Sequence, residues 1–175
     1  LRGNLRDFPF RDPKQGQFLV TAKAHDARID YAEGWPVIEH IEADMEFDYG
    51  MRIKAQRGRI LGATIGPVEV SMPDFDVMDE MLIIKGKAAG PTGEFLKFIE
   101  RSPVAASIDH FTAGMQAQGQ GELDLAIDLP LRRIDDTKVR GRYQFANNTL
   151  QVVEGLPPIT DVHGTLDIIE ASVTA

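Results

Sequence analysis

Residues 41–55 read IEADMEFDYGMRIKA, and this stretch sets the pattern for most of the chain. Apolar side chains alternate with acidic ones up to Tyr49, Gly50 interrupts the run, and apolar side chains then alternate with basic ones. Alternation puts successive side chains on opposite faces of a strand, so each strand has one apolar and one charged face. The acidic face of the first strand can lie beside the basic face of the second, which favours an antiparallel pair.

The same period of two recurs along the chain. The further alternating stretches are residues 18–24, 29–31, 60–64, 68–72, 82–88, 123–129, 138–145, 150–152, 162–168 and 173–175. Polar pairs between them predict tight turns at His25-Asp26, at Arg57-Gly58 and at Asn147-Asn148, the last as a type I′ turn because Asn tolerates positive φ. The pattern therefore predicts about ten or eleven short strands in antiparallel meanders.

Residues 91–101 depart from this pattern. Four apolar residues within them fall at helical spacing, Thr92 is placed to cap the first turn, and Ser102-Pro103 ends it. We predict one short helix here. Residues 107–115 have weaker periodicity and fit either a loop or a helical turn.

One-sided strands need a cover for their apolar face, which can be a second sheet, the helix or a ligand. We therefore predict a mainly β fold, built as a long, curled, antiparallel sheet of repeating units with a groove-like apolar face and one short helix. The alternative is a β-sandwich, in which two apolar faces close on each other.

Length and composition exclude several classes of protein. The 175 residues carry a formal net charge of −8, which argues against nucleic acid as a partner because that affinity comes from clustered cations. The absence of cysteine excludes disulfides, thiolate nucleophiles and cysteine-ligated metals. The most apolar runs, such as Met81 to Ile84, are strand-sized, so we do not expect this segment to span a membrane.

An internal repeat is visible at an offset of 121 residues, between positions 33 and 154. Glu33-Gly34-Trp35-Pro36 recurs as Glu154-Gly155-Leu156-Pro157, and the apolar residues that follow match at the same spacings. We expect residues 1–175 to be one β-rich segment of a longer array. Its repeat unit covers roughly residues 18–138, and a second unit begins at about residue 139 and is cut at residue 175.

Several stretches together resemble a known family. The most specific is residues 26–38, DARIDYAEGWPVI, with its Gly-Trp-Pro element. The others are residues 51–55, 58–62 (GRILG), 93–98 (GEFLKF), 102–104 (SPV), 119–121 (GQG), 123–125 (LDL), 129–131 (LPL), 139–141 (VRG) and 145–150 (FANNTL). In this order, over nearly the whole chain, they resemble the periplasmic region of the large AsmA-like proteins of the YhdP type.

The resemblance implies a location and a role. It implies the periplasmic portion of a long inner-membrane-anchored protein of Gram-negative envelopes, whose repeating β units form a hydrophobic groove. The implied function is phospholipid transport between the inner and outer membranes and maintenance of the outer-membrane barrier. The implied partners are phospholipid acyl chains and the neighbouring β units of the parent chain.

Simple energetics agree with a groove. Each methylene removed from water is worth about 0.8 kcal/mol, or roughly 12 kcal/mol for a sixteen-carbon chain, so a dry concave face can sheathe an acyl chain. The candidate groove-lining residues are Ile41, Ala43, Met45, Phe47, Leu123, Leu125, Ile127, Val139, Tyr143 and Phe145. The alternative is that they form an ordinary closed core, in which case the chain is a structural or protein-interaction module of the envelope.

Enzymatic chemistry finds little support in the sequence. No nucleophile elbow, phosphate-binding loop or dinucleotide fingerprint is present, so we expect neither catalysis nor a cofactor. The four histidines have no partner at helical spacing, and the pairs Asp74/Asp76 and Asp135/Asp136 are typical of turns, so no metal site is predicted. Trp35 fits an apolar plug better than an exposed sugar-stacking platform, because Leu156 replaces it in the repeat.

Overall fold

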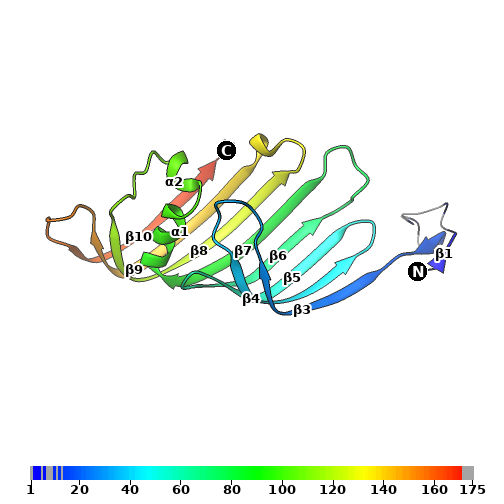
Figure 1. Ribbon diagram of the computed structural model, residues 1–175, viewed down its shortest axis with the longest axis horizontal. Helices are drawn as coiled ribbons and strands as arrows, with labels where there is room; N and C mark the ends of the chain where they lie inside the picture. Colours follow the sequence, from blue (N-terminus) through cyan, green and yellow to red (C-terminus); the bar gives the residue numbers. More distant parts are fainter. Residues whose placement is uncertain (1, 5, 7–9, 11, 13, 171–175) are drawn as a thin grey trace.

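The computed structural model describes residues 2–4, 6, 10, 12 and 14–170. Eight strands form one antiparallel sheet in chain order, from β3 at one edge to β10 at the other (Figure 1). Its strands are β3 (Val20–Ile29), β4 (Ile38–Phe47), β5 (Met51–Ile60), β6 (Ala63–Met72), β7 (Met81–Pro91), β8 (Gln116–Pro130), β9 (Lys138–Gln151) and β10 (Ile159–Glu170). A small separate pair, β1 (Arg2–Gly3) and β2 (Gly16–Gln17), lies beyond β3.

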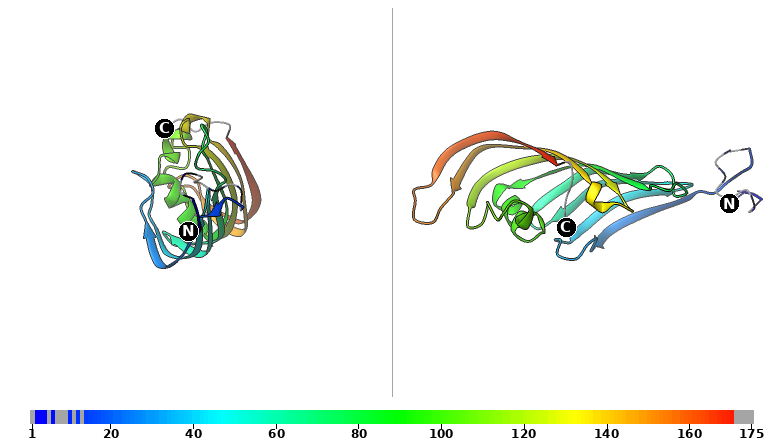
Figure 2. Two further views of the ribbon diagram at one scale, coloured as in Figure 1. Left: turned by 90° about the vertical axis from the view of Figure 1, so that its right-hand side faces the viewer. Right: turned by 90° about the horizontal axis from the view of Figure 1, so that it is seen from above.

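The sheet is strongly curled, and helices lie on its concave side. The connection from β7 to β8 contains α1 (Thr92–Glu100) and α2 (Val104–Ser107), and a short 3₁₀ turn, η2 (Ile134–Asp136), lies between β8 and β9. Seen along the long axis, the strands curve around the helices (Figure 2, left). The predicted mainly β fold with a curled antiparallel sheet and a short helix is confirmed.

Register explains why the alternation in the sequence becomes one continuous apolar face. Met45 pairs with Ile53, and Ile53 pairs with Val70. The same row continues through Ile84 to Ile127. Directly opposed residues of neighbouring strands point to the same side of a sheet, so the apolar set of each strand joins that of the next.

Within the described residues, no second sheet covers the concave face. Among these residues, the buried hydrophobic core consists of Phe10, Ala43, Ala63, Met72 and Ala105. The chain exposes 11825 Å², whereas a compact monomer of 19.4 kDa exposes roughly 8500 Å². The described part of the chain is therefore an open, curled sheet and not the alternative β-sandwich.

The helix is where the sequence predicts it, but Thr92 does not cap it. The N-cap residue is Pro91, which makes no side-chain capping hydrogen bond. Thr92 is buried instead, and its hydroxyl receives hydrogen bonds from the sheet. Residues 107–115 contain the end of α2 followed by turns.

The three predicted tight turns are wrong, because the strands continue through all three positions. Asp26 and Asn147, with φ of 50° and 55°, lie inside β3 and β9, and β5 continues through Arg57-Gly58. Each position accompanies a register shift, which is a β-bulge. At Asp26 and Asn147 the bulge uses the left-handed backbone that a hairpin turn also uses, so residues that favour this backbone cannot distinguish the two structures. The actual connections are residues 30–37, 61–62 and 152–158.

These bulges form a line across the sheet near one rim. Register shifts interrupt the pairs β3–β4, β4–β5, β6–β7, β8–β9 and β9–β10. The residues with positive φ along this line are Asp26, His40, Gly66, Gly119, Asn147 and Asp161. Bulges increase local twist and bend the strand, which accounts for the strong curl.

The two hairpins that share the sequence repeat also share backbone details. Asp26 and Asn147 hold equivalent bulges, and so do His40 and Asp161. Gly34 and Gly155 both have positive φ in the connecting loops. The boundaries proposed for the repeat unit stay a prediction, and the strand expected at residues 173–175 lies outside the described residues.

Candidate functional site

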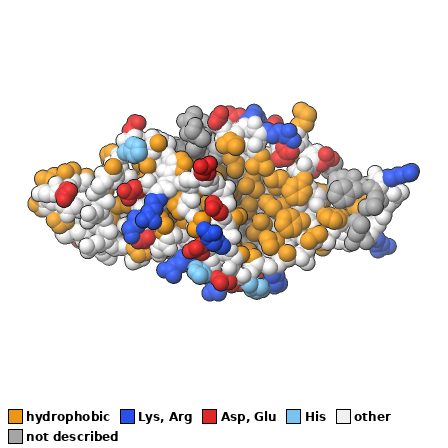
Figure 3. All heavy atoms as spheres, viewed as in Figure 1, with side chains coloured by type: hydrophobic (Ala, Val, Ile, Leu, Met, Phe, Trp, Pro, Cys, Tyr) orange, Lys and Arg blue, Asp and Glu red, His pale blue; other side chains and the backbone are white. Residues whose placement is uncertain are grey.

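The candidate site is the apolar concave face of the sheet, which we call the groove face. We define it by two neighbouring rows of registered residues and by the residues beside them. The first row is Ala22, Met45, Ile53, Val70, Ile84, Ile127 and Val139; the second is Ala24, Ala43, Ala55, Val68, Gly86, Leu125, Gly141 and Ile168. Orange side chains gather over β4 to β7 on the face seen in Figure 3.

All ten predicted lining residues lie on this face. Met45, Ile127 and Val139 belong to the first row, and Ala43 and Leu125 to the second. The remaining five flank these rows along their own strands: Ile41, Phe47, Leu123, Tyr143 and Phe145.

The second row mixes small and large side chains. Ala24, Ala43 and Ala55 are successive partners on β3, β4 and β5. On β7, the space that a side chain at Gly86 would take is filled by Val68, which lies 2.8 Å from that position.

Helix α1 covers one end of the groove face. The rings of Phe95 and Tyr143 lie 4.9 Å apart, and Tyr143 stacks on Phe145 at 5.8 Å. Tyr143 and Phe145 therefore form an aromatic cluster with the helix. Apolar side chains remain visible on the face over β4 to β7 (Figure 3).

A buried polar cluster anchors α1 to the sheet. The Oγ1 atom of Thr92 accepts hydrogen bonds from the Tyr143 hydroxyl at 2.9 Å and from Asn148 Nδ2 at 2.5 Å. Asn148 is completely buried, and burial raises the pKa of Tyr143. Breaking such a cluster leaves unpaired polar atoms in an apolar place, so the first turn of α1 is held firmly.

A second contact joins α1 to the far side of the sheet. Trp35, in the loop between β3 and β4, lies with its ring 5.9 Å from Phe98 and 6.1 Å from Tyr31. Glu94 of α1 also accepts a hydrogen bond from the backbone N–H of Gly62 in the turn between β5 and β6. Trp35 is half-buried in this contact, as expected for an apolar plug.

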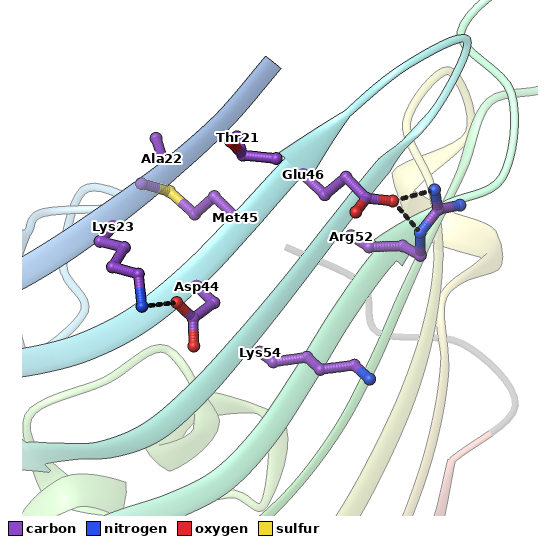
Figure 4. A pocket seen from close by; sticks show the side chains of 8 residues that line it. All are labelled: Thr21, Ala22, Lys23, Asp44, Met45, Glu46, Arg52 and Lys54. Carbon is purple, nitrogen blue, oxygen red and sulfur yellow. Dashed lines mark hydrogen bonds and ion pairs between the residues drawn. The ribbon is translucent and has the colours of Figure 1, made fainter. Parts of the chain in front are cut away.

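The convex face carries charges in ion pairs between neighbouring strands. Lys87 lies 2.8 Å from Asp124, and Arg142 lies 2.7 Å from Asp167. A hollow of about 500 Å³ on β3 to β5 is lined mostly by polar and charged residues of this face, together with Ala22 and Met45 of the groove face (Figure 4). Its charged lining residues include Lys23, paired with Asp44 at 3.1 Å. These exposed ion pairs make the convex face charged and solvated, so only the concave face of the sheet is apolar.

Titratable groups show no catalytic arrangement within the described residues. His25 pairs with Glu42, and His40 pairs with Asp26, all of them at the bulge of β3 and β4. Hydrogen bonding to His25 lowers the pKa of Glu42. Residues 14–170 and the few described before them contain no group of three or more potential metal ligands. Neither helix in this part of the chain has the length and hydropathy that a membrane crossing requires.

Two contacts of α1 are not predictable from the sequence pattern. Consecutive Asn residues favour positive φ and predict a turn at Asn148, and only the register reveals this residue as a buried anchor. The contact between Trp35 and Phe98 joins residues far apart in the chain, and the alternation pattern carries no signal for it.

The family model described as YhdP protein matches residues 1–175. The chain is 23% identical over 149 residues to the intermembrane phospholipid transporter YhdP of Escherichia coli (strain K12), an alignment that covers 85% of this chain. It spans only 12% of the length of that relative. No solved structure matches. The chain is therefore a member of the YhdP family.

Proposed function

We propose that this chain is a groove segment that holds phospholipid acyl chains during transport between the inner and outer membranes. The observation that carries the proposal is the groove face itself, a row of apolar partners running through β4 to β9 that no second sheet covers in the described part of the chain. The relative named as an intermembrane phospholipid transporter gives the class of ligand.

The physical argument rests on the difference between the two faces. An acyl chain on the groove face exchanges contact with water for contact with Met, Ile and Val side chains, at about 0.8 kcal/mol for each buried methylene. The headgroup stays in water at the open mouth, where it need not be desolvated. Because the row crosses successive strands without a charged residue, a chain can shift along it without meeting a polar barrier.

The same proposal accounts for the edges of the sheet. Within the described residues, β3 and β10 each pair with one strand of the large sheet only. Leu166 and Ile159 of β10 are each 56% exposed. Neighbouring β units of a parent chain would extend the sheet at these edges and lengthen the groove, in the periplasmic portion of an inner-membrane-anchored protein.

Native mass spectrometry of the protein purified from a Gram-negative host tests the proposal. We expect co-purifying phospholipid, identified after organic extraction. Leu125→Asp places a charge on the groove face and should lower lipid occupancy about tenfold or more. Ala126→Asp is the matched control, because Ala126 is the next residue of β8 but faces Lys85 and Arg140 on the convex side.

Two results would contradict the proposal. One is a folded wild-type protein free of lipid. The other is equal loss of lipid in both variants, which would point to a general effect on folding. Either result would favour the structural or interaction module.

A further inference from the structure

The loop of residues 30–37 and α1 meet across the groove, although they start from distant strands. β4 and β8 are separated by β5, β6 and β7, which is about 19 Å on a flat sheet. The rings of Trp35 and Phe98 nevertheless lie 5.9 Å apart. The curl of the sheet and the length of α1, about 13 Å, together bridge the gap. Figures 1 and 2 show the loop and the helix beside each other over the concave side.

The loop and α1 are held in place by different kinds of contact. α1 is anchored through Thr92 to Asn148 and through Glu94 to Gly62. Within the loop, the backbone N–H of Trp35 donates a hydrogen bond to the carbonyl of Ala32, and the loop meets α1 through the ring of Trp35. The helix is therefore the fixed half, and the loop is the half that can move with the least loss of hydrogen bonding.

The second hairpin supplies an internal comparison. Leu156 stands at the position equivalent to Trp35, and its backbone makes the equivalent hydrogen bond, to Val153. Leu156 is 59% exposed, whereas Trp35 is half-buried against Phe98. The aromatic contact is thus a property of the first loop and not of the hairpin type.

We propose that Trp35 and Phe98 form the closing contact of a side gate in the groove. With the contact made, the loop and α1 bound the mouth of the groove, and a held acyl chain is shielded from water on that side. With the contact broken, the loop swings away from the fixed helix, and phospholipid passes sideways between groove and membrane. This inference rests on the proposed function and adds the residues that control lipid exchange.

The test measures lipid exchange by native mass spectrometry. Lipid-loaded protein is incubated with vesicles of deuterated palmitoyl-oleoyl phosphatidylglycerol, and the rate of label uptake is followed. Trp35→Ala should raise the rate about tenfold, the change that ~1.4 kcal/mol of lost closing contact produces. Phe98→Ala should do the same, and the double variant should add little, because both remove one contact. Leu156→Ala is the matched control and should exchange at the wild-type rate.

An engineered disulfide between the loop and the start of α2, which we call the staple, tests the closed state without removing the aromatic rings. A side chain at Gly34 would lie 4.0 Å from Pro103, and the chain has no cysteine of its own. In Gly34→Cys/Pro103→Cys, oxidation should slow exchange relative to the same variant in its reduced form, which is the reference because a Cys at the positive φ of Gly34 strains the loop in both forms. Trp35→Leu, which introduces the residue found in the second loop, should exchange faster than wild type while keeping the wild-type circular dichroism spectrum.

The outcomes separate the two proposals. Lipid-bearing wild-type protein whose exchange is unchanged by Trp35→Ala and by the oxidised staple would overturn the gate and leave the groove standing. An effect of Leu156→Ala equal to that of Trp35→Ala would also overturn the gate. A wild-type protein that neither carries nor takes up lipid would overturn the proposed function, and the gate with it.

Discussion

Gly119 shows how tightly a single residue is constrained where the sheet meets α1. It has a φ of 111°, and a side chain there would come within 2.0 Å of Asn148 Oδ1. Gly119→Ala should therefore lower the free energy of unfolding by about 3 kcal/mol, through backbone strain and displacement of the buried amide. Gly114→Ala is the control, since Gly114 also has positive φ but nothing within 4 Å. Its cost should be about 1 kcal/mol in urea unfolding. Equal losses would contradict the role given to Asn148.

Glu80 is the residue whose titration most clearly reports a contact between loops. Arg132 donates two hydrogen bonds to its carboxylate, at 2.7 and 2.8 Å, and these lower the pKa of Glu80 to about 2. A lowered pKa in the folded state means that the stabilisation is complete above the ordinary value of 4.5 and is lost as the pH falls through about 2. An NMR titration of the Glu80 carboxyl carbon should have its midpoint near 2.

The control for this titration is the neighbouring arginine. Arg132→Gln should return the Glu80 midpoint toward 4.5, whereas Arg133→Gln should leave it in place, because Arg133 pairs with Asp79 at 3.4 Å. A midpoint near 4.5 in the wild-type protein would mean that the loops between β6 and β7 and between β8 and β9 are not joined in solution.

At the scale of the element, the bulges decide the shape of each strand. Asn147 lies within β9 at a φ of 55° and is exposed. Asn147→Val should destabilise the protein by about 1–2 kcal/mol, because a β-branched residue is strained in the left-handed region. Asn147→Gly should be close to neutral in the same thermal or urea unfolding experiment. Gln144→Val, at an extended and exposed position of β9, is the control and should change stability little. A neutral Asn147→Val would argue that the bulge is absent.

The sequence pattern predicts strands and the helix correctly, but it does not distinguish turns from bulges. The alternation in residues 41–55 correctly predicts two paired strands with one apolar face, because side-chain burial follows a period of two. The helix at residues 92–100 is equally readable from its apolar spacing. Turns and bulges were confused at Asp26 and Asn147, because both use left-handed residues and only strand pairing separates them.

The groove face could be predicted because it follows from local spacing along each strand. The contacts that cover it could not, because they join residues far apart in the chain. All ten lining candidates could be placed on one face from local spacing alone. The approach of α1 to Tyr143 and of Trp35 to Phe98 depends on the curl of the sheet. That curl accumulates from bulges spread over most of the strands, and no local pattern in the sequence encodes it.

At the scale of the whole molecule, the sheet is curved, with an apolar concave face and a charged convex face. Ion pairs such as Lys87 with Asp124 line the outside, and apolar rows line the inside. The helices close part of the mouth and leave the face over β4 to β7 accessible (Figure 3). The proposed lipid-holding role rests on this division of faces, because an acyl chain on the apolar face is separated by the sheet from the charged face in water.

The most direct measurement is a photo-cross-linking scan with benzoylphenylalanine along the groove, in protein loaded with phospholipid. The scanned positions form three pairs of neighbours on opposite faces: Ile53 and Lys54, Val70 and Ser71, and Ile127 and Asp128. We predict lipid adducts at the first member of each pair and none at the second, on β5, β6 and β8 alike. Adducts of equal yield on both faces, or none at the three apolar positions of a folded, lipid-bearing protein, would contradict the account.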